Sequence, residues 1–216
     1  WSSWLGIDKT KIQTVYLGIN DKKFHPLPPK KKEYILVHFH GTYIPLQGAL
    51  KIIETARICV SEPKLRFRLI GNGREFPLAK KLAEKYKLRN IEFIGQVPLA
   101  ELNSYLGEAD IVLGIFGDRA KTRRVIPNKV YEGLASGRPI ITMDTPAIRE
   151  LFSDQDLLLV KNDPISMGEA IMRLANDPAL RADLARQGQE MVMKYVPIEI
   201  AKSLIKVIPN KYNQNV

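Results

Sequence analysis

Short apolar runs alternate with amphipathic helical stretches along most of this chain, and this alternation limits the fold more than any other feature. The clearest strands are predicted at residues 34–40, 65–70, 91–94, 110–116, 139–143 and 157–160. Nearly continuous apolar strands are typical of a parallel sheet that is covered on both faces. With short connections between them, they predict an α/β fold built on a doubly wound, Rossmann-like parallel sheet.

Charge narrows the choice of partner. The net charge is +10, from 33 basic and 23 acidic residues, which favours phosphates, an acidic membrane face or nucleic acid. We interpret the lysine run at residues 30–32 as a solvated linker. A second basic cluster consists of Arg119, Lys121, Arg123, Arg124 and Lys129. No aromatic residues are interleaved with these cations and no basic recognition helix is apparent, so we predict no nucleic-acid partner.

Two further features concern location. No apolar run reaches the length of about 18 residues that a membrane-spanning helix needs. The single Cys59 permits no internal disulfide, and we interpret it as a small buried hydrophobic residue. We therefore predict a cytoplasmic protein, with peripheral contact to the inner face of the membrane as an alternative.

Glycines follow two of the predicted strands, at the edge where ligands of such sheets bind. They occur as Gly41-Thr42 and as Gly71-Asn72-Gly73. A glycine there lets a phosphate or sugar approach the backbone, and a following helix N-terminus favours negative charge. Plain turn glycines would give the same pattern. A P-loop is excluded, and so is the dinucleotide fingerprint, because the further residues of both motifs are absent.

The chain shows no pattern typical of a metal or cofactor site. We expect His38 and His40 to point to opposite faces of their strand, so that they share no metal ion. No Asp-x-Asp pair is present to hold a metal–diphosphate complex. We therefore predict no metal and no cofactor, and expect arginine, lysine and backbone amides to meet the charge of any diphosphate.

Residues 126–141 read as a loop, a short helix, a glycine turn and the start of a buried strand. Asn128 is predicted to cap the helix, and Gly137 suits the left-handed position just past its end. Glu132 lies in the N-terminal half of this helix, where its carboxylate is placed to accept hydrogen bonds from a vicinal diol such as a ribose. A solvent-exposed surface carboxylate is the alternative.

This stretch resembles the donor-site motif of family 4 glycosyltransferases, which have the two-domain GT-B fold. The similarity extends from about residue 11 to residue 208, and its core reads Pro127-Asn128-Lys129-x-x-Glu132-x-x-Ala135-x-Gly137-x-Pro139-Ile140-Ile141. The resemblance implies the C-terminal, nucleotide-sugar-binding half of a GT-B enzyme whose N-terminal acceptor half is missing. It also implies a retaining, metal-independent transferase, with a nucleotide-diphosphate sugar as donor substrate.

Roles follow for individual residues. Glu132 would hold the ribose hydroxyls, and Arg124 and Lys129 would act as catalytic residues by stabilising the diphosphate. The residues expected to bind the donor are Gly41, Thr42, Gly71, Asn72, Gly73, Gln96, Val97, Asn128 and Glu132.

Three positions depart from the family's pattern. Arg124 stands where the family has its first Glu, and Thr42 and Gln47 stand where it has Arg and Lys. In one interpretation Arg123, Arg124 or Lys129 takes over the diphosphate. In the other the chain is a non-catalytic GT-B-like binding module. A third hypothesis is that the lysines bind an anionic polymer or a membrane surface.

The domain prediction has three parts. Residues 1–32 lead in from the missing domain, with one strand at about residues 11–17. Residues 33–196 form the nucleotide-sugar-binding domain, in which Asp163-Pro164 and Asp177-Pro178 begin two capped helices. Residues 197–216 form a helix that returns toward the missing half, followed by a polar tail. Because the chain begins with Trp1, we interpret it as a fragment. We expect it by itself to transfer little or no sugar, since the other wall of the cleft is missing.

Overall fold

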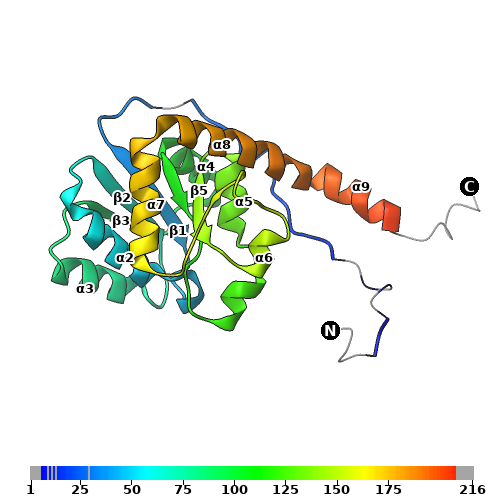
Figure 1. The fold of residues 1–216 in the computed structure, drawn as a ribbon, viewed down its shortest axis with the longest axis horizontal. Coiled ribbons are helices and arrows are strands. Elements are labelled where there is room, and N and C mark those ends of the chain that lie inside the picture. The colour runs from blue at the N-terminus through cyan, green and yellow to red at the C-terminus, as the bar shows by residue number, and fades with distance from the viewer. Residues whose placement is uncertain (1–5, 9, 11, 13, 29, 208–216) are drawn as a thin grey trace, which may run out of the picture.

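A parallel sheet forms the centre of the computed structural model, which describes residues 6–8, 10, 12, 14–28 and 30–207. Within these residues the sheet has six strands in the order β3-β2-β1-β4-β5-β6 (Figure 1). Along the chain the strands are β1 (Ile35–Gly41), β2 (Leu65–Gly71), β3 (Ile91–Ile94), β4 (Ile111–Leu113), β5 (Ile140–Met143) and β6 (Leu158–Val160). The predicted doubly wound sheet is confirmed, and its order reverses between β1 and β4, where ligands of such sheets bind.

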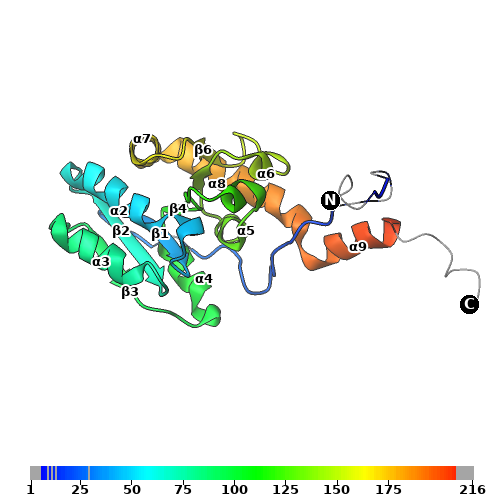
Figure 2. The ribbon, with the colours of Figure 1, turned by 90° about the horizontal axis from the view of Figure 1, so that it is seen from below.

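Helices cover both faces of the sheet and create two separate hydrophobic cores (Figures 1 and 2). One core lies under α2 (Ala49–Ile58), α3 (Phe76–Lys85) and α7 (Pro164–Asn176). The other lies under α4 (Leu99–Glu108), α5 (Asn128–Ala135) and α6 (Pro146–Arg149). Short 3-10 turns are η2 (Pro45–Gln47), η3 (Cys59–Ser61), η4 (Ala120–Arg124) and η5 (Met193–Tyr195).

The two C-terminal helices have different surroundings. α8 (Pro178–Val192) packs against α7 and α5 and buries residues in both cores. α9 (Pro197–Val207) projects away from the sheet (Figure 2). The two predicted aspartate caps are confirmed: Asp163 accepts a hydrogen bond from Ser166 N, and Asp177 accepts one from Leu180 N, both at 2.8 Å. The predicted tail lies outside the described residues.

The N-terminal segment differs from the prediction. Residue 12 and residues 14–17 form no strand, while residues 11 and 13 lie outside the described part. Val15 and Leu17 are exposed, and the backbone N–H of Ile19 donates to the Tyr195 carbonyl at 3.0 Å. The predicted strand is therefore wrong over the described residues, because an alternating β-branched pattern forms a strand only where a partner strand is in reach.

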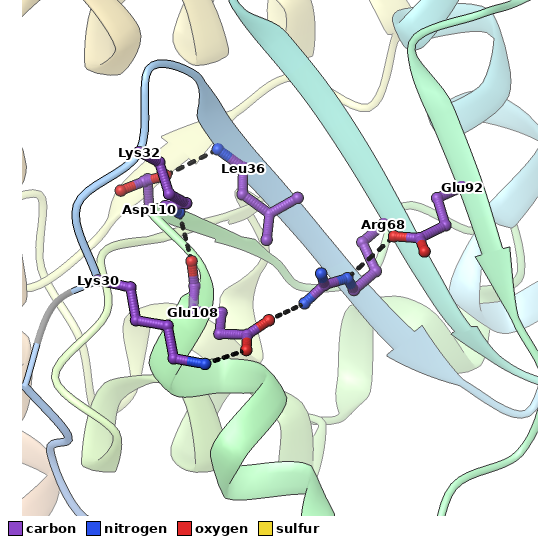
Figure 3. Close-up of polar contacts among 7 residues, drawn as sticks. All are labelled: Lys30, Lys32, Leu36, Arg68, Glu92, Glu108 and Asp110. Carbon is purple, nitrogen blue, oxygen red and sulfur yellow. Dashed lines mark hydrogen bonds and ion pairs between the residues drawn. The ribbon is translucent and has the colours of Figure 1, made fainter.

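The lysine run before β1 is only partly a solvated linker, because Lys32 is largely buried whereas Lys30 and Lys31 are exposed (Figure 3). Lys30 Nζ lies 2.6 Å from a carboxylate oxygen of Glu108, and Lys32 Nζ lies 2.6 Å from Asp110 Oδ2. The same Asp110 oxygen accepts the backbone N–H of Leu36 at 2.7 Å. Our interpretation is wrong for Lys32, whose ammonium group is largely buried against Asp110, a carboxylate that also binds β1. Lys30 remains a solvent-exposed side chain with one surface ion pair.

Candidate functional site

Glycines bring the carboxyl ends of β1 and β2 into close backbone contact. Gly41 pairs with Gly71 across the two strands. Gly71 and Gly73 have φ of +119° and +146°, which side chains strongly disfavour. A Cβ atom on Gly71 would collide with the Gly41 carbonyl oxygen, and one on Gly73 with the carbonyl oxygen of Thr42. Four predicted donor-binding residues thus lie together at the edge of the sheet.

Gln47 holds the loop after β1. Its side-chain oxygen accepts the backbone N–H of Tyr43 at 3.1 Å, and its amide nitrogen donates to the Thr42 hydroxyl at 3.3 Å. Tyr43 has a positive φ of 46°, so the loop adopts a conformation that needs such support. Sequence reasoning missed this role and treated Gln47 only as the replacement of a cation.

The loop after β3 is joined to the same edge through its backbone. The Gly71 N–H donates to the Gly95 carbonyl at 3.1 Å, which places Gln96 and Val97 next to the end of β2. Gln96 and Asn72 are exposed, whereas Val97 is half-buried beside the core under α4. No hydrogen bond joins these three residues to α5 within the described chain, and their role in binding a base stays a prediction.

Helix α5 begins without a side-chain cap. Pro127 occupies the N-cap position in extended conformation, and Asn128 is the exposed first residue of the helix. The predicted cap is therefore wrong by one position, and proline has no side-chain acceptor to offer. The first backbone N–H groups of α5 have no capping side chain, which favours an anion at this end. Gly137 has a φ of +68° after the helix, as predicted.

Lys129 is a buried amine that has no hydrogen-bond partner in the described residues. It is only 4% exposed, and its Nζ lies 4.0 Å from the centroid of the Phe39 ring. A Cβ atom built on Gly41 would lie 2.9 Å from this Nζ, so the amine reaches the glycine edge of the sheet. Burial lowers the pKa of Lys129 from 10.5 to about 7, and the nearby carboxylate of Glu132 only partly opposes this shift.

Glu132 lies opposite the end of β1 and is hydrogen-bonded to a histidine of that strand. Its Oε2 lies 2.8 Å from His40 Nε2, and His40 Nδ1 lies 3.1 Å from His38 Nε2. The two histidines are therefore on the same face, and our expectation of opposite faces is wrong. Side chains two residues apart in a strand share a face, so the sequence did carry the signal for this contact.

The remaining cations form a separate group on η4. Its buried residue, Thr122, donates its hydroxyl hydrogen to the Leu46 carbonyl at 3.4 Å and anchors the turn on η2. The exposed cations are Arg119, Lys121, Arg123 and Arg124. Within the described chain no hydrogen bond or ion pair joins Arg124 to Lys129 or Glu132. Its catalytic role stays a prediction.

Comparison with known proteins identifies the family to which this chain belongs. The model of the family described as glycosyl transferases group 1 matches residues 20–191. This chain belongs to that family. It is 24% identical over 189 residues to the uncharacterized glycosyltransferase MJ1178 of Methanocaldococcus jannaschii, a match that covers 87% of this chain and 50% of that protein. The chain spans about half the length of the curated relatives that it matches.

Solved glycosyltransferase structures share the architecture. The C-terminal domain of LpcC from Francisella tularensis, a glycosyl transferase group 1 family protein, aligns with a TM-score of 0.71 at 21% identity. That alignment covers 83% of this chain and 100% of the LpcC domain. Anabaena HepE in complex with UDP aligns with a TM-score of 0.74 at 14% identity, over 90% of this chain and 56% of HepE. The predicted C-terminal half of a GT-B fold is confirmed.

Two findings bear on other predictions for this glycosyltransferase chain. Among the residues that the structure describes, no helix combines the length and apolarity needed to cross a bilayer. In the same residues, no three His, Cys, Asp or Glu side chains converge on a point where a metal ion would sit. His38, His40 and Glu132 are instead linked one after another by hydrogen bonds.

Proposed function

We propose that this chain is the donor-binding domain of a retaining, metal-independent glycosyltransferase that uses a nucleotide-diphosphate sugar. One observation carries the proposal: the Lys129 amine, which has no hydrogen-bond partner among the described residues, lies one helical turn from the carboxylate that Glu132 directs to His40, at the glycine edge of the sheet. An amine suits a diphosphate, and a carboxylate suits the hydroxyls of a ribose. HepE, which has this fold, is bound to UDP in its crystal structure.

The diphosphate has several partners in this proposal. Lys129 donates to it, and the uncapped N–H groups of α5 face the same charge. These groups stabilise the negative charge that develops on the leaving diphosphate, which is the main electrostatic task of a transfer without a metal. Gln47 is engaged in holding the loop, so Lys129 carries the part that the family assigns to a cation on that turn. The retaining outcome rests on the family resemblance alone.

Calorimetric titration of the chain with UDP, GDP and ADP tests the proposal. We expect one diphosphate to bind, and Glu132→Ala and Lys129→Met each to weaken it by about tenfold or more, as loss of a charged hydrogen bond does. Glu169→Ala, a change of an exposed carboxylate on α7, is the matched control and should bind like the native chain. The proposal is wrong if no diphosphate binds, or if both site variants bind as well as the control.

A further inference from the structure

A hydrogen-bonded line of three side chains runs from the interior of the sheet to the proposed donor site. It starts at His38, which is fully buried in the middle of β1, and passes through His40 near the strand's end. It ends at Glu132 on α5, whose side chain is 14% exposed. The two contacts are 3.1 Å and 2.8 Å long.

The carboxylate of Glu132 determines which atom donates in each hydrogen bond of the line. An ionised carboxylate only accepts hydrogen bonds, so His40 Nε2 must carry the hydrogen that it shares with Glu132. In a neutral His40 the other nitrogen, Nδ1, carries no hydrogen and accepts a hydrogen bond from His38 Nε2–H. His38 Nδ1 is left as a buried acceptor without a partner in the described residues.

The surroundings keep both rings neutral. Burial lowers the pKa of His40 in spite of its bond to Glu132, and the nearby Lys129 on α5 acts in the same direction. Burial lowers the pKa of His38 even more strongly, and Arg68 on β2, His40 and Lys129 add to the effect. A proton on either ring would add positive charge beside Lys129. A proton on His40 Nδ1 would also set two N–H groups against each other between the rings.

We propose that His40 is a positioning residue for donor binding, and that His38 supports the tautomer in which His40 does so by donating to its Nδ1. His40 holds Glu132 by one carboxylate oxygen, Oε2. The other oxygen has no hydrogen-bond partner within the described chain and is free to accept from the ribose hydroxyls. A carboxylate that is fixed before the ligand arrives loses less conformational entropy on binding. This inference rests on the proposed function.

The test compares two substitutions of His40. His40→Leu removes the donor to Glu132, whereas His40→Gln keeps an N–H group that reaches the carboxylate. Using whichever of UDP, GDP and ADP the native chain binds most tightly, we expect His40→Leu to weaken binding about tenfold. His40→Gln should recover most of that loss. Thermal denaturation of both variants shows whether they fold.

Two further measurements separate positioning from a merely structural role. If His40 acts through Glu132, adding His40→Leu to Glu132→Ala should cause no further loss of affinity. The 2′,3′-dideoxy form of the same diphosphate lacks the ribose hydroxyls, so native chain and His40→Leu should bind it equally. Additive losses, or an equal loss with the dideoxy nucleotide, would overturn the proposal.

A readout without nucleotide tests the line itself. Histidine-selective nitrogen NMR should show His38 and His40 as neutral rings that are protonated on Nε2, and Glu132→Ala should perturb the Nε2 signal of His40. A Nδ1-protonated His40 would overturn the inference while leaving the proposed function standing. Failure of the native chain to bind any diphosphate would instead overturn both.

Discussion

Replacing Lys129 by methionine should make this protein more stable at neutral pH while it weakens nucleotide binding. The side chain is 4% exposed and its amine has no hydrogen-bond partner in the described residues. Burial of an ammonium without a partner is expensive, and the lowered pKa of about 7 expresses that penalty. Methionine has a similar shape and no charge to desolvate.

The size of the effect follows from the pKa shift. Each unit between the folded and unfolded states corresponds to about 1.4 kcal/mol, so a shift from 10.5 to about 7 destabilises the folded chain by roughly 4 kcal/mol at pH 7. We therefore expect Lys129→Met to gain up to about 4 kcal/mol at pH 7.

The gain should depend on pH in one direction. The folded-state pKa of Lys129 is lowered, so the unfolded chain binds more protons between the two values and native stability rises with pH. The penalty is fully present below pH 7 and disappears as the pH approaches 10.5. By pH 10 the difference between native chain and Lys129→Met should fall below about 1 kcal/mol.

Urea denaturation at pH 7 and pH 10, with linear extrapolation, measures both differences. Lys121→Met is the matched control: this lysine is exposed on η4, so its replacement should change stability by less than about 0.5 kcal/mol at either pH. A Lys129→Met variant that is no more stable than the native chain at pH 7 would refute the reasoning, and so would a gain that persists at pH 10. A stabilised variant that still binds nucleotide normally would separate Lys129 from the donor site.

Three further changes test the framework around the site. Asp110→Ala should destabilise the chain by about 1–3 kcal/mol in urea, because the backbone N–H of Leu36 loses its carboxylate acceptor; an unchanged midpoint would contradict this. Gly73→Ala should cost at least about 1–3 kcal/mol and weaken nucleotide binding, since its φ is +146° and the new Cβ meets the Thr42 carbonyl. Cys59 is buried with a pKa raised to about 11, so a thiol reagent at pH 8 should label it only after unfolding.

Gly95→Ala is the control for the glycine prediction. Gly95 follows β3, and a Cβ atom there meets no atom within 4 Å. If Gly95→Ala and Gly73→Ala are equally destabilising, the clash and the positive φ of Gly73 do not explain the effect, because Gly→Ala in open space should stabilise slightly by restricting the unfolded chain. For Cys59, rapid labelling of the folded chain would show that the thiol is accessible.

Local sequence patterns were sufficient for most of the fold. Apolar runs of strand length located every strand of the sheet, since burial on both faces leaves a signal in neighbouring residues. Asp163 and Asp177 were recognisable as helix caps because a capping bond spans only three residues. The strand expected at about residues 11–17 is absent from the described part of that range for the opposite reason: a strand needs a partner strand, and a local pattern does not show whether one is in reach.

The residues of the proposed donor site show the same division between what the sequence and the tertiary structure decide. The sequence by itself singled out Glu132, Lys129 and the glycine loops, because each belongs to a short motif. Only the tertiary structure decided which of these side chains are buried and which groups they contact. The bond between His40 and Glu132 joins residues 92 positions apart, and the burial of Lys129 depends on β1 lying beside α5. Charge and hydrogen bonding depend on distance and on exclusion of water, which no local pattern of residues records.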